Sequence, residues 1–205
     1  MPPRDYPQNV FINCPFDDDY QPIFNAIVFA TYDCGYIARC ALEQDNGSIS
    51  RFEKIYKMIS ECKFGIHDIS RTELDDTNHL PRFNMPLEFG VFLGARRYGG
   101  HLQKTKNCLI LDRERYRYQK FISDISGQDI RSHQNEPEKA IKHVRNWLNN
   151  SSKATIPSGD RIYSRYISFI NNLPDLCDTL KLNRDEIEFN DYVVLVSQWL
   201  RANNW

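Results

Sequence analysis

The sequence of 205 residues lacks the short motifs of the common nucleotide-dependent and hydrolytic enzymes. It contains no GxGxxG, no GxxxxGK[ST] and no GxSxG. The dinucleotide-binding fingerprint, the phosphate-binding P-loop and the serine-hydrolase elbow are therefore excluded as the basis of its chemistry. No group of His, Cys and Asp residues has the spacing of a metal site, so the sequence predicts neither a metal ion nor a cofactor.

The chain also lacks a large net charge and a long hydrophobic run. It has 26 Lys and Arg against 27 Asp and Glu residues, and such a balance gives no electrostatic footprint for a nucleic-acid polymer or an anionic membrane. No apolar run is long enough to span a bilayer, and the N-terminal MPPRDYPQNVFINC has no apolar segment typical of a signal peptide. We therefore expect a cytoplasmic protein with a small-molecule ligand.

The six cysteines show no CxxC pair, and several fall inside apolar segments. This placement is typical of small buried hydrophobic residues rather than of disulfides or metal ligands.

What the sequence does contain is an alternation of short apolar runs and longer helical patterns. Strands are predicted at 9–14, 36–43, 63–70, 107–112 and 128–133, and helices at 17–36, 51–63, from Asn84 onward, at 116–127 and at 136–150. Such alternation favours a parallel sheet covered on both faces. We predict an α/β fold of the flavodoxin-like, doubly wound type, with about five strands.

The composition changes at SSKATIPSGD, residues 151–160, which is small, polar and rich in helix breakers. Two helical stretches follow, at 161–182 and 185–205. The sequence thus predicts an α/β domain over residues 1–150 and a C-terminal helical extension over 161–205. The extension is predicted to be a helical cap or an interaction element.

In an open parallel sheet, ligands bind outside the carboxyl ends of the strands. Asn13 and Asp68 stand at the ends of the first and third predicted strands, and the helix from Asn84 follows the loop after the third strand. We therefore expect Asn13, Asp68 and Glu88 to border one pocket at this edge. Asp68 has a second interpretation, because an acid at a strand end often caps the following turn through its own backbone.

Glu88 is the one acid in the apolar stretch NMPLEFGVFLGA. Asn84 is a suitable N-cap and Pro86 is tolerated in the first turn, so the sequence places Glu88 at the edge of that turn. On a helical wheel it shares a face with apolar residues, among them Val91 and Phe92. Two interpretations stay open: the acid complements the helix dipole, or it faces a ligand.

Charged residues follow the other strands as well. Arg113, Arg115 and Arg117 come directly after the fourth predicted strand and are expected to form a solvated face. His67 is expected to pack beside its strand. Asp17 and its two acidic neighbours are expected to be a solvated helix start.

Three segments together resemble the nucleoside 2-deoxyribosyltransferase-like group, including its predicted deoxyribohydrolase branch, a relative of Toll/interleukin-1 receptor (TIR) NADase domains. They are VFINCPFDDDYQPIFNAI, ISRFEKIYKMISECKFGIHDIS and RFNMPLEFGVFLG. The resemblance covers roughly residues 9–112, and the last segment is the most specific. The C-terminal helices lie outside it.

The resemblance implies roles for particular residues. Glu88 in LEFG corresponds to the family's glutamate nucleophile, and Asp68 in HDIS to the acid that holds the base or ribose. The remaining substrate-binding candidates lie in the same three motifs: Asn13, Pro15 and Phe16 in NCPF, Ser70 in HDIS, and Asn84 and Met85 before LEFG. The transferases carry an aspartate about six residues before the glutamate, where this chain has Arg82, so hydrolysis fits better than transfer to a second base.

The resemblance therefore implies an N-glycosidase that cleaves the base–ribose bond of NAD or a (deoxy)nucleotide, with NAD as substrate rather than cofactor, and a role in bacterial stress or anti-phage defence. A carboxylate suits this reaction because it stabilises or traps the oxocarbenium-like sugar. Two alternatives stay open: a non-catalytic module that senses a nucleotide, and a TIR-like domain that acts through its surfaces.

Overall fold

The computed structural model describes residues 4–72, 74, 79–151 and 155–204. Five parallel strands form one sheet in the order β2-β1-β3-β4-β5. The strands are β1 (Asn9–Asn13), β2 (Ile37–Cys40), β3 (Phe64–Asp68), β4 (Asn107–Asp112) and β5 (Ile130–Ser132). The predicted α/β, flavodoxin-like fold is confirmed, and all five predicted strands are present.

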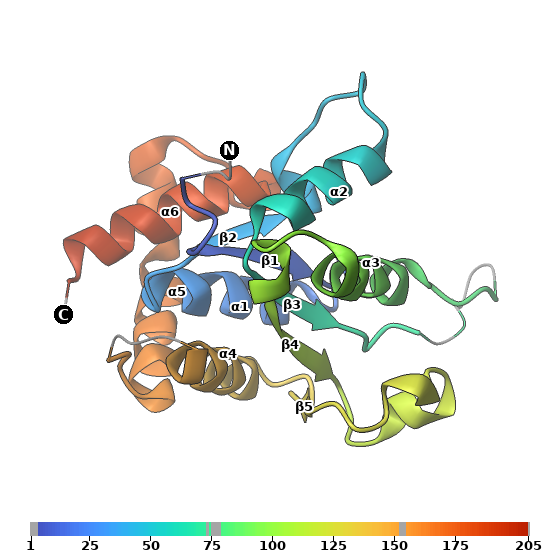
Figure 1. Cartoon of the computed structure of the whole chain (residues 1–205). Helices are drawn as coiled ribbons and strands as arrows, with labels where there is room; N and C mark the ends of the chain where they lie inside the picture. Colours follow the sequence, from blue (N-terminus) through green and yellow to red (C-terminus); the bar gives the residue numbers. More distant parts are fainter. Residues whose placement is uncertain (1–3, 73, 75–78, 152–154, 205) are drawn as a thin grey trace.

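The described residues form six α-helices. They are α1 (Gln21–Asp33), α2 (Arg51–Glu61), α3 (Asn84–Tyr98), α4 (Pro137–Ser151), α5 (Gly159–Leu180) and α6 (Phe189–Ala202). Of these, α1 and α4 lie on one face of the sheet and α2 and α3 on the other (Figure 1). Because side chains alternate along a strand, Val10 and Ile12 pack into the core under α1 and α4, while Phe11 packs under α2 and α3. Burial on both faces explains why the central strands are apolar almost throughout.

The C-terminal helices pack on the outside of α1 and α4 and share their core. Phe29 of α1 stacks on Phe169 of α5 and also contacts Trp199 of α6. Arg165 binds the buried Asp33 carboxylate with N–O distances from 3.0 Å. The hydrophobic core thus continues past residue 150, and the division into two domains stays a prediction.

Three local expectations are corrected. The predicted helix at 116–127 consists of two short 3₁₀ helices, η3 (Arg117–Lys120) and η4 (Ser123–Ile125), and Tyr116, with a φ of 62°, has a left-handed conformation that does not continue an α-helix. Helix α1 begins only at Gln21, after a turn. Part of the predicted linker lies outside the described residues, and α5 begins at Gly159, capped by Ser158.

All six cysteines are free, and five of them are buried, as expected for small hydrophobic side chains. Among the residues that the structure describes, no helix has both the length and the apolar character needed to cross a membrane.

Candidate functional site

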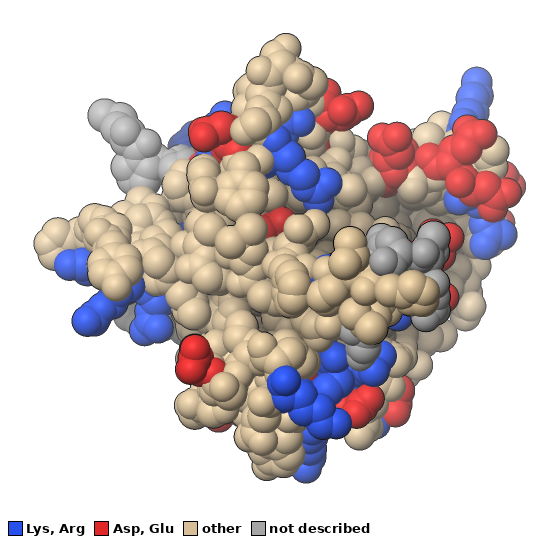
Figure 2. All heavy atoms as spheres, turned by 90° about the vertical axis from the view of Figure 1, so that its right-hand side faces the viewer, with Lys and Arg blue, Asp and Glu red and all other residues tan. Residues whose placement is uncertain are grey.

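The site predicted from the sequence lies at the carboxyl edge of the sheet, to which the arrowheads of β3 and β4 point in Figure 1. Figure 2 looks onto this side of the molecule. The centre of this face shows mainly uncharged residues, and the charged side chains gather around its rim. Asn13, Asp68 and Asp112 end their strands at this edge, and His133 follows β5 directly.

Asp68 is fully enclosed and joins three loops. The Tyr20 hydroxyl, from the loop after β1, donates to Asp68 Oδ2 at 2.6 Å, and the backbone N–H of Ser70 donates to Oδ1 at 2.9 Å. The Ser70 hydroxyl also donates to Oδ1. His133 Nε2 lies 3.0 Å from Oδ2, while its Nδ1 accepts the N–H of Asn135, which leaves Nε2 to carry the proton.

These contacts decide the ionisation of Asp68. Burial raises the pKa of the carboxyl, but the contacts with His133, Ser70 and Tyr20 outweigh it and hold the pKa below its usual value. Asp68 is 0% exposed, so it stays an anion without reaching the molecular surface. In this conformation it fastens the loops after β1, β3 and β5 together.

Asn13 ties β1 to the start of α3. Its side-chain amide donates to the Met85 carbonyl at 2.8 Å and lies 3.1 Å from His67 Nδ1. His67 is fully buried against the rings of Phe89 and Phe92, and burial lowers its pKa to about 3, so the imidazole is neutral. The expected packing of His67 is confirmed, and Asn13 fixes where α3 begins.

The start of α3 differs from the sequence expectation by one residue. Phe83 occupies the N-cap position without a side-chain cap, and Asn84 is already the first helical residue. Glu88 therefore lies in the second turn, and the first turn contains no acid. Because the helix dipole acts mainly on groups in the first turn, it gives Glu88 little stabilisation.

Glu88 is 7% exposed and accepts no hydrogen bond from the described residues. Burial raises its pKa to about 7, and the positive charge of Arg51, the first residue of α2, lowers it in part. A buried acid without a donor is unusual in a folded protein. Glu88 is thus ready to change its charge near neutral pH.

The other sequence candidates lie around these two acids. Pro15 and Met85 are buried, and Phe16 packs against the Phe24 ring. Ser70 is buried on Asp68, whereas Asn84 is exposed. The electrostatic influence of both Asp68 and Glu88 reaches Cys14, whose pKa is raised mainly by burial. Asp68 ends β3 and Glu88 lies near the start of α3, the next helix along the chain, so both acids lie toward the same edge of the sheet.

One arginine was misjudged from the sequence. Arg117 does not belong to a solvated face, because its guanidinium is buried and binds Asp112 at 2.8 Å. It also donates to the Ile69 carbonyl at 2.7 Å and so joins the ends of β3 and β4. Tyr20 and His133 were not among the residues predicted for the site, and Arg51 was interpreted as an unremarkable residue at the start of a helix. For His133 the available signal was its position directly after a predicted strand.

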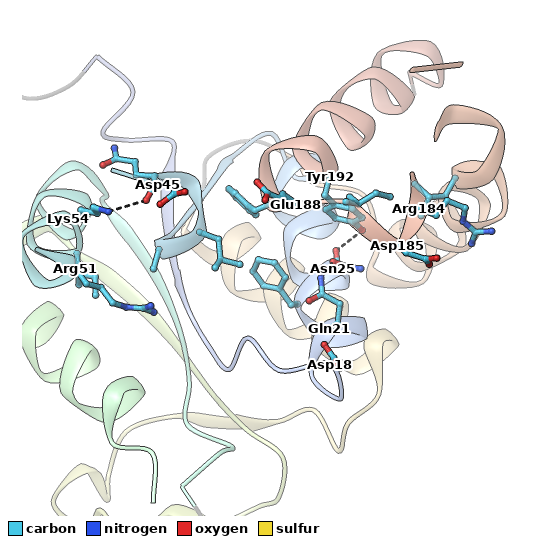
Figure 3. A pocket seen from close by; sticks show the side chains of 18 residues that line it. Asp18, Gln21, Asn25, Asp45, Arg51, Lys54, Arg184, Asp185, Glu188 and Tyr192 are labelled. Atoms are coloured by element: carbon cyan, nitrogen blue, oxygen red, sulfur yellow. Dashed lines mark hydrogen bonds between the residues drawn. The ribbon is translucent and has the colours of Figure 1, made fainter. Parts of the chain in front are cut away.

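A cavity of about 760 Å³ opens beside this edge. Its lining comes from residues 18–55 and from residues 173–192, here called the C-terminal segment. Figure 3 shows Arg51 and Lys54 of α2 on one side, and Glu188 and Tyr192 of the C-terminal segment on the other. Gln21 and Asn25 of α1 lie on the same side as Tyr192, whose hydroxyl donates to the Asn25 carbonyl at 3.2 Å. Asn13, Asp68 and Glu88 do not line this cavity, and the pocket predicted to be common to them stays a prediction.

In the described parts of the chain, no three His, Cys, Asp or Glu side chains gather in a way that could hold a metal ion. Comparison of the sequence with family models and with curated proteins returned no match.

Proposed function

We propose that the protein is an N-glycosidase that cleaves the base–ribose bond of NAD or a (deoxy)nucleotide, with Glu88 as the catalytic carboxylate. The observation that carries this proposal is the state of Glu88, which is buried, has no donor within the described chain, and has a pKa raised to about 7. Acids whose pKa is perturbed by burial in this way are concentrated at functional sites. The resemblance of its LEFG segment to the deoxyribosyltransferase-like group supports the same role.

The chemistry follows from a carboxylate held beneath a sugar. As the C1′–N bond breaks, its electron pair leaves with the base, and the positive charge that develops on C1′ and the ring oxygen is stabilised by the Glu88 anion. If a Glu88–C1′ ester forms, water then attacks C1′, the carboxylate is released and one proton is lost. With NAD the base leaves as neutral nicotinamide and needs no proton.

The residue at position 82 supports hydrolysis rather than transfer to a second base. The transferases have an aspartate in this region, whereas this chain has Arg82, which is exposed and lies 3.8 Å from Asp17. A cationic side chain there does not offer the acceptor group that an incoming base would need. We propose that the enzyme works in the cytoplasm, in bacterial stress or anti-phage defence, and that its C-terminal helices contact a second copy or a sensor protein.

The test is release of free base, followed by chromatography, when the purified protein is incubated with a panel of NAD, nucleosides and nucleotides. Glu88→Gln is expected to abolish release, because Gln keeps the size of Glu but not its charge. Glu136→Gln, at an exposed position before α4, is the matched control and should keep full activity. Release that survives Glu88→Gln would disprove the assignment, and altered ligand affinity without turnover would favour the sensing module.

A further inference from the structure

Arg51 connects the cavity in Figure 3 with Glu88, because Arg51 lines the cavity and its charge acts on Glu88. Glu88 itself is not part of the lining. Helices α2 and α3 pack side by side, with Ile55 and Phe92 in one buried cluster. Arg51 lies four residues before Ile55, and Glu88 four residues before Phe92, so each pair occupies one face of its helix. Arg51 and Glu88 therefore occupy corresponding positions on the two helices, each one turn nearer the carboxyl edge of the sheet than the packed pair. Arg51 also lines the cavity.

This arrangement defines a path for a ligand. A molecule whose sugar meets Glu88 and whose other part fills the cavity must pass Arg51. Arg51 makes no ion pair with the described residues, and Lys54, one turn further along α2, contacts only the Gln44 carbonyl, at 3.4 Å. Asp45 lines the same side of the cavity beside Lys54, but among the described residues no carboxylate forms an ion pair with Arg51 or Lys54.

The far side of the cavity has a different character. Phe24 and Tyr192 provide aromatic surface, and Gln21 and Asn25 provide side-chain amides. Asp18, Asp185 and Glu188 add three acids on this side of the cavity, against one cation, Arg184. Amides and carboxylates accept from the amino groups of a nucleobase, whereas the acids disfavour further phosphates. A volume of about 760 Å³ is within the range of small-molecule sites, about 300 to 1,000 Å³.

We propose that this cavity binds the non-reacting nucleoside of a pyrophosphate-linked dinucleotide, with Arg51 and Lys54 on the pyrophosphate. The proposal rests on the proposed function for the position of the reacting sugar beside Glu88. It makes the C-terminal segment, through Tyr192 and its neighbours, part of the substrate site. It also selects a dinucleotide such as NAD over a mononucleotide or a triphosphate.

The first experiment compares kcat/KM for nicotinamide release from NAD and from nicotinamide mononucleotide. Leu42 lines the cavity and is 45% exposed, so Leu42→Trp should narrow the cavity without disturbing the core. We expect kcat/KM for NAD to fall about 10-fold or more, and that for the mononucleotide to stay within about twofold, because the mononucleotide does not enter the cavity. Ile167→Trp, at a similarly exposed position outside the lining, is the matched control.

If Leu42→Trp changed kcat/KM equally for both substrates, or for neither, the cavity proposal would be overturned. Base release by the wild-type protein would still support the proposed function. Unchanged turnover of the mononucleotide also shows that the variant is folded. In the wild-type protein, kcat/KM should be higher for NAD than for the mononucleotide, and the values for each variant are compared with this ratio.

A second experiment does not depend on turnover. ADP-ribose is titrated calorimetrically into Glu88→Gln protein, with and without Leu42→Trp. We expect binding that Leu42→Trp weakens about 10-fold or more. If no substrate releases its base but this binding pattern holds, the proposed function fails and the cavity assignment stands. Failure of ADP-ribose to bind, or binding that Leu42→Trp leaves unchanged, overturns the assignment.

Discussion

Two buried carboxyl groups lie at the same edge of the sheet and are held in opposite ways. Asp68 is fully enclosed, is surrounded by donors from three loops and has a pKa below its usual value. Glu88 is 7% exposed, has no donor from the described chain, and has a pKa that burial raises to about 7. Its carboxylate oxygens are not among the fully buried atoms without a partner, so they reach solvent. Hydrogen bonds from the protein thus offset the burial of Asp68, whereas no hydrogen bond from the described chain offsets the burial of Glu88.

The difference separates a structural acid from a functional candidate. A buried anion whose hydrogen-bonding capacity is satisfied is a fixed part of the fold, because any rearrangement would break several contacts. A buried acid without partners destabilises the fold when it is charged, and it can form new interactions as soon as a ligand supplies them. Of the two residues assigned to the substrate by the resemblance, Glu88 therefore fits a chemical role better in this conformation.

The strongest test of this comparison is Asp68→Ala. Removal of the carboxylate leaves the Tyr20 hydroxyl, the Ser70 N–H and His133 Nε2 without their acceptor in a buried site. We expect the free energy of unfolding to fall by about 3 to 5 kcal/mol, as for other broken buried networks. Urea denaturation measures it, and Glu88→Gln is the matched variant, expected to keep the wild-type stability or exceed it at pH 8. Equal losses in the two variants would contradict the comparison.

The pH dependence of stability gives the next largest effect. The pKa of Glu88 is raised from 4.5 to about 7, so the folded chain binds this proton more tightly than the unfolded chain does. Its contribution to stability is present in full below pH 4.5 and is lost as the pH rises through 7. Between pH 5 and pH 8 we expect wild type to lose about 2 to 3 kcal/mol relative to Glu88→Gln, at 1.36 kcal/mol per pKa unit.

The measurement is a pair of urea denaturation series, for wild type and for Glu88→Gln, at pH 5, 6, 7 and 8. Only the difference between the two proteins is used, because other groups titrate equally in both. A difference that stays constant over this range would show that Glu88 is solvated or hydrogen-bonded like an ordinary surface acid.

A smaller effect is expected from Arg51, whose charge partly offsets the burial of Glu88. Arg51→Ala should raise the pKa of Glu88 further, so the midpoint of the pH profile of kcat/KM should move to higher pH for base release from a nucleoside, which has no phosphate for Arg51 to bind. At pH 7 we expect a loss of a few-fold, which recovers toward pH 9. Lys57→Ala, which removes the same charge from an exposed position on α2, is the control. A pH profile whose midpoint does not move would show that Arg51 does not affect the pKa of Glu88.

The sequence predicted the fold well because β1, β3 and β4 are short, mostly apolar runs that end at an acid or shortly before a proline, whereas β2 and β5 gave weaker signals. It also placed Asp68 and Glu88 on one edge, since Asp68 ends β3 and the helix of Glu88 follows that strand in a parallel sheet. It did not distinguish the two acids, because the donors to Asp68 come from Tyr20 and His133, far away in the sequence. Arg117 was misjudged for the same reason: its partners Asp112 and Ile69 belong to neighbouring strands.

The smallest expected effect concerns how the Glu88 helix is held. Asn84 is exposed and does not cap α3, whereas the Ser50 hydroxyl accepts the Glu53 N–H and caps α2. Asn84→Ala should therefore change the free energy of unfolding by less than about 0.5 kcal/mol, while Ser50→Ala should lower it by about 1 kcal/mol. Thermal or urea denaturation of both variants decides. If Asn84→Ala were as damaging as Ser50→Ala, a cap at Asn84 would hold the start of α3, and Glu88 would belong to the first turn, where the helix dipole alone could account for an acid.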